Sequence, residues 1–200
     1  MPSSMDFYLN WAKERSDEMN AVMTSLAGKA NEIAADSRSK ADQLMAELGA
    51  RRDAFQDQMR RQAEGGEAAW AETRARLDAE WNNFQADVKK YIDRFGQQFK
   101  QQQATFQDIA NAQLHAWREA ASSIQSASAD LAADHRTKIE AAVQRMKADA
   151  ATAEANFEKL KKAGSESWAA WNVALAESRS AFDRANQAAW DAFRRAGPGA

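Results

Sequence analysis

Few side chains in this chain of 200 residues could do chemistry, and those few are scattered. His115 and His135 are the only histidines, and cysteine is absent, which excludes disulfides, thiol catalysis and thiolate metal ligands. A di-iron bundle needs paired Glu-x-x-His segments, and neither histidine has a glutamate three residues before it. His115 and Glu119 are four residues apart and could share a metal ion, but two ligands do not make a site. We therefore predict no metal and no cofactor.

Other catalytic patterns are missing as well. Gly65 and Gly66 are the only adjacent glycines, and no glycine-rich phosphate-binding loop is present. No arrangement of serine, histidine and acid can be argued from the sequence. The chain is predicted not to be an enzyme, with no catalytic residue and no small-molecule substrate. The net charge of -2 gives no general attraction to nucleic acid, which is not expected as a partner.

The strongest pattern is a set of aromatic residues spaced eleven apart. One such ladder consists of Phe84, Phe95, Phe106 and Trp117. Eleven residues make three helical turns at about 3.67 residues per turn, so a ladder marks one helix face that another helix must cover. The predicted stripe residues, which form a core or an interaction surface, are Trp11, Phe55, Trp70, Trp81, Phe84, Phe95, Phe106, Trp117, Phe157, Trp168, Trp171, Phe182, Trp190 and Phe193.

The composition predicts an all-α protein. The only prolines are Pro2 and Pro198, so nothing between them interrupts a helix by proline. Strong helix formers dominate the chain, and the β-branched residues that favour strands are few. We predict a single domain over residues 1–200, an elongated antiparallel bundle of long helices with eleven-residue (hendecad) apolar periodicity.

Two breaks divide the predicted bundle. Gly65-Gly66 is the clearest turn signal, and a serine-rich stretch near residues 122–128 is the second. They give three helices over residues 5–63, 67–126 and 130–196, each about 90 to 100 Å long. The ladder keeps its phase through Gly66, which leaves an alternative. In that alternative one very long helix covers residues 5–126, and helix 130–196 returns along its second half.

The aromatic residues favour a turn near residues 125–129. Such a turn makes a helical hairpin over residues 67–196, with residues 5–63 as an N-terminal helical arm. Antiparallel pairing then places Trp81 and Phe84 opposite the tryptophans at positions 168 and 171. The return helix would cover the aromatic stripe of residues 70–117.

Pairs of cations recur along the chain and could form a basic surface. They are Arg51, Arg52, Arg60, Arg61, Lys89, Lys90, Lys161 and Lys162. Acidic residues are interspersed throughout, so the simpler interpretation is an ordinary solvated helix face. The alternative, functional interpretation is a lipid-binding patch.

The repeats lead to two hypotheses about function. Eleven-residue amphipathic repeats resemble those of exchangeable apolipoproteins, although the prolines that separate apolipoprotein repeats are missing here. Three long helices are similar in outline to membrane-bending BAR domains, and no motif assigns the chain to either family. We predict a non-enzymatic structural or scaffolding protein that associates with itself as a homodimer or higher oligomer. The alternative is a peripheral protein that binds or shapes a membrane surface through its amphipathic helices.

The location is predicted from missing targeting signals. The N-terminal residues contain no signal-peptide-like apolar run, and no stretch approaches the apolar length of a transmembrane helix. We therefore expect a cytoplasmic protein, peripheral at a membrane under the second hypothesis.

Overall fold

A computed structural model describes residues 4–65, 70–99, 102–129, 133–164 and 167–196. These residues form six α-helices and two short 3₁₀ helices and contain no strand, which confirms the all-α prediction. The α-helices are α1 (Ser4–Gly28), α2 (Arg38–Gly65), α3 (Trp70–Phe95), α4 (Gln102–Ala127), α5 (Ala133–Lys162) and α6 (Trp168–Ala196). The 3₁₀ helices are η1 (Ala30–Glu32) and η3 (Gly96–Gln98).

The predicted three long helices are wrong, and so is the alternative of one helix over residues 5–126. The chain also breaks between α1 and α2, between α3 and α4, and between α5 and α6. Ile33 and Phe99 end the two 3₁₀ helices in extended conformations, with ψ of 132° and 127°. Gly164 follows α5 with φ of 64°, a left-handed conformation that commonly ends helices. α2 ends at Gly65, as the glycine pair indicated, whereas Gly66 lies outside the described residues.

The hendecad ladder misled the prediction because it passes through these breaks. Val22, Ile33 and Leu44 keep their spacing across the connection between α1 and α2. Val22 and Ile33 are buried and Leu44 is half-buried, although Ile33 lies outside any helix. The spacing therefore records which residues enter the core, and it does not require one continuous helix.

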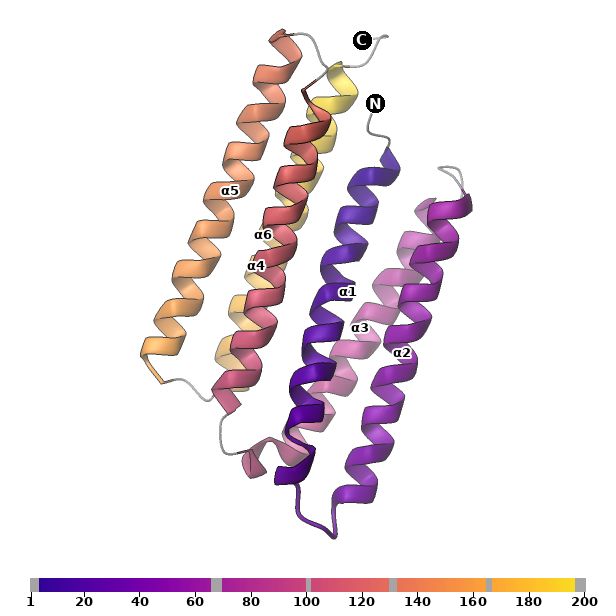
Figure 1. The fold of residues 1–200 in the computed structure, drawn as a ribbon, viewed down its shortest axis with the longest axis vertical. Helices are drawn as coiled ribbons and strands as arrows, with labels where there is room; N and C mark the ends of the chain where they lie inside the picture. Colours follow the sequence, from indigo (N-terminus) through magenta and orange to yellow (C-terminus); the bar gives the residue numbers. More distant parts are fainter. Residues whose placement is uncertain (1–3, 66–69, 100–101, 130–132, 165–166, 197–200) are drawn as a thin grey trace.

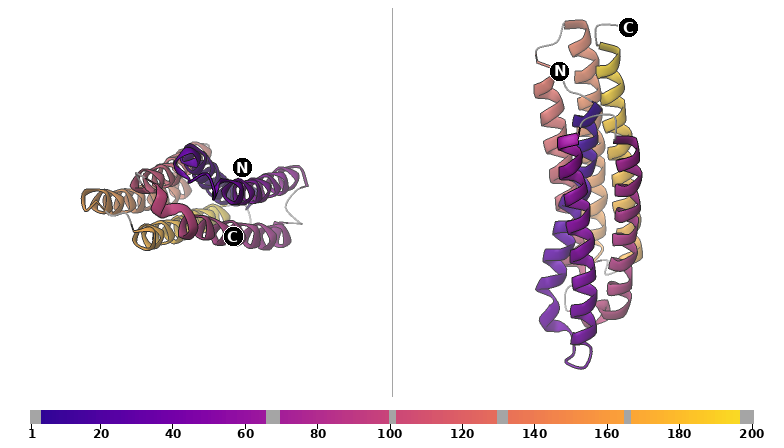
Figure 2. Two further views of the ribbon diagram at one scale, coloured as in Figure 1. Left: turned by 90° about the horizontal axis from the view of Figure 1, so that it is seen from below. Right: turned by 90° about the vertical axis from the view of Figure 1, so that its right-hand side faces the viewer.

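The six helices form a compact bundle in which consecutive helices run antiparallel (Figure 1). α5, α4, α1 and α2 lie side by side in that order, and α6 and α3 lie behind them (Figures 1 and 2). The chain thus forms two groups of three helices, α1–α3 and α4–α6, which meet chiefly where α1 packs against α4. Helices of 25 to 30 residues are about 38 to 45 Å long. They are about half the predicted length, because each long segment folds back once.

The aromatic rings of the second group pack across short helices rather than along one long hairpin. Trp171 on α6 stacks on Phe157 of α5, with ring centroids 6.1 Å apart, and on Phe106 of α4 at 5.7 Å. Trp117 of α4 packs against Phe182 of α6 at 5.4 Å. α6 is therefore covered by α4, which lies within the predicted helix 67–126, and also by α5, which the prediction placed in the same helix as α6.

Part of the predicted neighbourhood is nevertheless formed. Trp81 and Phe84 of α3 line one small cavity together with Trp168 of α6. These residues meet as members of different helix groups, since α3 ends at Phe95 and α4 carries the chain back.

Candidate functional site

The two helix groups meet along a seam, by which we mean the contacts between helices α1–α3 and helices α4–α6. Charged side chains are buried there. Glu14, Arg15 and Glu18 of α1 and Arg179 of α6 are each 6% exposed or less. Charged residues are rarely buried so fully unless they are paired, so the seam is the most unusual chemical environment in the described part of the chain.

Arg15 is the centre of this network. Its Nη1 donates to Glu14 Oε2 at 2.5 Å, and its guanidinium donates to both carboxylate oxygens of Asp183 on α6, at 3.0 and 2.8 Å. The guanidinium also lies 5.0 Å from the ring centroid of Trp11 and 5.9 Å from that of Trp81. A bidentate ion pair and ring stacking are the two contacts that a planar guanidinium makes best. Arg15 therefore ties α1 to both α3 and α6.

Glu14 is the least satisfied member of the network. It is fully buried, and within the described residues its Oε1 has no hydrogen-bond partner. Burial raises the pKa of Glu14 to about 7, against the opposing attraction of Arg15. A buried carboxylate is costly because the protein interior solvates charge poorly. This carboxyl therefore changes its charge near neutral pH.

A second set of polar contacts continues along the seam. Gln113 Nε2 of α4 donates to Glu18 Oε2 at 2.8 Å and to the carbonyl oxygen of Leu175 at 3.2 Å. Arg179 Nε lies 3.4 Å from the same Glu18 oxygen, and its guanidinium lies over Trp81 at 5.2 Å. Glu18 is thus held by one side chain from α4 and one from α6.

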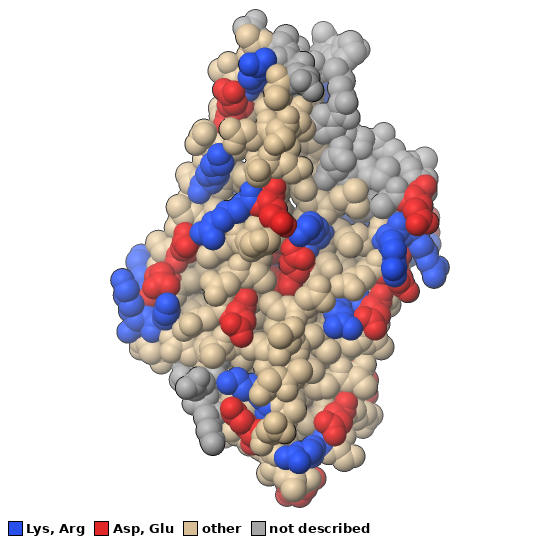
Figure 3. Space-filling model, in the orientation of Figure 1, with Lys and Arg blue, Asp and Glu red and all other residues tan. Residues whose placement is uncertain are grey.

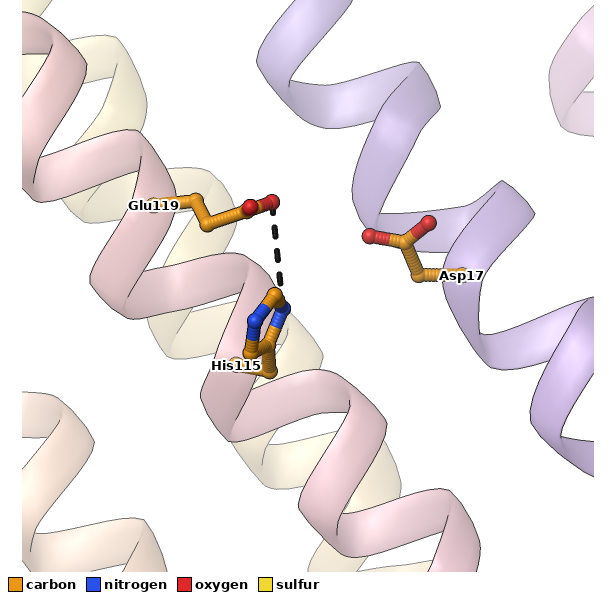
Figure 4. Close-up of side chains that lie close together, drawn as sticks. All are labelled: Asp17, His115 and Glu119. Atoms are coloured by element: carbon orange, nitrogen blue, oxygen red, sulfur yellow. Dashed lines mark ion pairs between the residues drawn. The ribbon is translucent and has the colours of Figure 1, made fainter.

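The exposed edge of the seam carries a smaller cluster (Figure 4). Asp17 of α1 lies opposite His115 and Glu119 of α4, and His115 Nδ1 is 3.8 Å from Glu119 Oε2. Lys13 Nζ donates to Asp17 Oδ2 at 2.7 Å and to Glu119 Oε2 at 2.6 Å. The hydrogen bond from Lys13 lowers the pKa of Glu119. The side chain of His135, the other histidine, lies outside what the structure describes.

The predicted stripe residues are buried or half-buried wherever their side chains are described. The buried ones are Trp11, Phe55, Trp81, Phe84, Phe95, Phe106, Trp117, Phe157, Trp171, Phe182 and Phe193. Trp168 and Trp190 are half-buried, and the Trp70 side chain lies outside the described part. Among the described residues, Val173 is the large apolar side chain that is exposed, at 57%. One chain therefore covers its own aromatic faces.

The predicted basic residues are mixed with acids on the surface. Ion pairs join Arg51 to Glu80 and Asp87, Arg52 to Asp53, Arg60 to Asp57, Lys89 to Asp93, Lys90 to Asp87 and Lys161 to Glu158. Arg61 and Lys162 are exposed. On the face seen in Figure 3, cations and anions alternate. The cation pairs thus belong to solvated helix faces.

The sequence-based prediction missed the buried charges, although the sequence carries a signal for them. Glu14 and Glu18 follow Trp11 by three and seven residues, which places them on the same helix face as that buried ring. Arg179 lies four residues after Leu175 and three before Phe182, again on a buried face. Charges at apolar-face spacing are the pattern to look for.

No protein-family model, curated protein or solved structure matches this chain significantly. In the part of the chain that the structure describes, no helix has the length and apolar character needed to cross a bilayer.

Proposed function

We propose that this chain is a non-enzymatic helical-bundle protein that binds an apolar surface, such as a lipid layer, by parting along the seam. The observation that carries the proposal is the combination of two kinds of contact in the bundle. The aromatic faces are covered within one chain, and the seam adds to this apolar packing two ion pairs between the helix groups, Arg15–Asp183 and Glu18–Arg179, whose arginines are buried.

The ion pairs between the two helix groups lower the cost of opening the seam. Replacing a buried ion pair by apolar residues of similar volume is often neutral or stabilising by about 1 to 4 kcal/mol, because ion pairs repay their desolvation poorly. When the seam parts, Arg15, Glu18 and Arg179 regain water. The free energy lost on opening is therefore smaller than for a wholly apolar interface of the same area.

Opening exposes a surface suited to the lipid boundary. Trp11, Trp81 and Trp168 lie at or beside the seam, and tryptophan prefers the region between headgroups and acyl chains. The charged partners would face water or headgroups after opening. In this proposal the closed bundle is the form in solution, and the opened amphipathic helices are the form bound to lipid.

Self-association is the competing proposal for the same stripes. A second copy could cover the aromatic faces only after the same parting of the seam, because each chain already covers them itself. Light scattering separates the two proposals, since a bundle that opens only on lipid stays monomeric in solution. A stable dimer without lipid would favour the scaffolding proposal.

The test locks the seam chemically. The chain has no cysteine, so Lys13→Cys with Glu119→Cys introduces one thiol on each side of the seam, at side chains that now contact each other at 2.6 Å. A short bis-maleimide reagent then bridges them. The matched control is Arg118→Cys with Glu154→Cys, a pair in contact at 2.9 Å between α4 and α5 of one helix group.

Binding is measured by flotation with phosphatidylcholine–phosphatidylglycerol vesicles and by the blue shift of tryptophan fluorescence. We expect both unbridged variants and the bridged control to bind, and the bridged seam variant to lose binding. Binding by the bridged seam variant at the level of the control would refute opening at the seam. Lack of binding by the unmodified protein would refute the lipid proposal as a whole.

A further inference from the structure

The cluster at the exposed edge of the seam combines three side chains that ligate metals. Asp17 comes from α1, and His115 and Glu119 come from successive turns of α4 (Figure 4). One ligand atom from each lies within 4.8 Å of the other two. In a tetrahedral site with metal–ligand bonds of about 2.0 to 2.2 Å, the ligand atoms stand roughly 3.3 to 3.6 Å apart. Small side-chain rotations therefore suffice to close the cluster around one ion.

The structure already places a cation at this position. The Lys13 ammonium donates to Asp17 at 2.7 Å and to Glu119 at 2.6 Å, so it occupies the space between the two carboxylates. Lys13 is half-exposed, and its long side chain can swing into solvent without disturbing a helix. The position thus attracts positive charge, and its present occupant can leave.

We propose that Asp17, His115 and Glu119 bind a divalent transition-metal ion, with Zn²⁺ as the best match, and that this ion displaces the Lys13 ammonium. One imidazole and two carboxylates suit Zn²⁺ or Co²⁺, whereas Ca²⁺ and Mg²⁺ prefer oxygen ligands alone. Water completes the coordination, because the cluster lies at the surface. Lys13 sets the affinity by competing for both carboxylates.

The ion would join the two helix groups, because its ligands come from both sides of the seam. A ligand that binds only the folded bundle raises the unfolding temperature, and the increase grows with the logarithm of the free ion concentration above its Kd. Slower opening onto lipid is a further consequence, and that consequence alone rests on the function proposed above. Metal binding by itself does not depend on it.

The test is calorimetric titration of the full chain with Zn²⁺ near neutral pH, supported by the visible absorption of bound Co²⁺. His115→Ala is expected to weaken Zn²⁺ binding by about tenfold or more, since even loss of an outer-shell partner weakens metal sites by that much. Lys13→Met should strengthen binding, because it removes the competing ammonium while keeping a side chain of similar length. The matched control, His135→Ala, removes the other histidine and should leave binding unchanged. Circular dichroism checks that each variant is folded.

Three results would overturn the proposal. They are no Zn²⁺ binding by the unmodified chain, equal losses for His115→Ala and His135→Ala, and weaker binding after Lys13→Met. None of these measurements involves lipid, so failure here and failure of the lipid proposal are distinguishable.

Discussion

Replacing Glu14 by glutamine should stabilise the bundle, and more so at alkaline pH. Burial raises the pKa of Glu14 from 4.5 to about 7. Because the pKa of this carboxyl is higher in the folded state, the folded protein loses the proton at a higher pH than the unfolded protein does. The associated penalty is absent below pH 4.5, grows as pH rises and is complete above pH 7. At 1.36 kcal/mol per pKa unit, the full penalty is about 3 kcal/mol.

The substitution removes that penalty because glutamine resembles the protonated carboxyl in shape and charge. The gain in free energy of unfolding for Glu14→Gln should therefore be about 2 to 3 kcal/mol larger at pH 8 than at pH 5. Urea unfolding followed by tryptophan fluorescence at the two pH values measures this difference. The control is Glu140→Gln, at an exposed position on α5. An equal effect of Glu14→Gln at both pH values would show that the Glu14 carboxyl is not responsible for any pH dependence.

Three further substitutions test the packing, the ion pairs and the backbone. Trp171→Ala should lower the free energy of unfolding by about 3 to 5 kcal/mol, since the ring is fully buried, and a loss near zero in urea unfolding would contradict that placement. Arg15→Met should lower the free energy of unfolding at pH 8 by about 3 to 5 kcal/mol, because the Glu14 carboxylate loses its buried partner. The loss should be smaller at pH 5, and equal losses at the two pH values would contradict this explanation. Gly164→Ala should lower the melting temperature, at a cost of about 1 to 2 kcal/mol, because its φ of 64° strains other residues. Gly28→Ala is the control in equally open space at a helix end, and the idea fails if both changes behave alike.

The sequence is sufficient to predict the all-α class of the fold. Trp117, Phe106 and Phe182 were predicted on apolar faces, and each is buried. The number of helices was not predictable in the same way. Hendecad spacing marks residues that are buried, but it does not show that they belong to one helix. Ile33 fits the spacing and is buried, yet it lies in the connection between α1 and α2. The turn after α1 also contains neither a proline nor a pair of glycines, so the local sequence gives only a weak prediction of a turn there.

The seam shows the other limit of sequence reasoning. His115 and Glu119 could be paired from their spacing alone, because positions four apart share a helix face. Asp17 could not be added to them, since only the packing of α1 against α4 brings it within reach. The same holds for Arg15 and Asp183, which lie near opposite ends of the chain.

A repeating ladder leaves the register between two packed helices ambiguous, and the Arg15–Asp183 pair removes that ambiguity. Helices with apolar residues every eleven positions can slide past one another by one repeat, about 16 Å, and still bury ring against ring. A slipped α1 would separate the buried Arg15 guanidinium from the Asp183 carboxylate on α6, and loss of a buried ionic partner costs several kcal/mol. The ion pairs that lower the cost of opening the seam thus also set the alignment in which α1 returns to it. We infer that these ion pairs fix the register of α1 against its neighbours. A repeating apolar stripe cannot fix the register alone, because it fits equally well after a shift of one repeat.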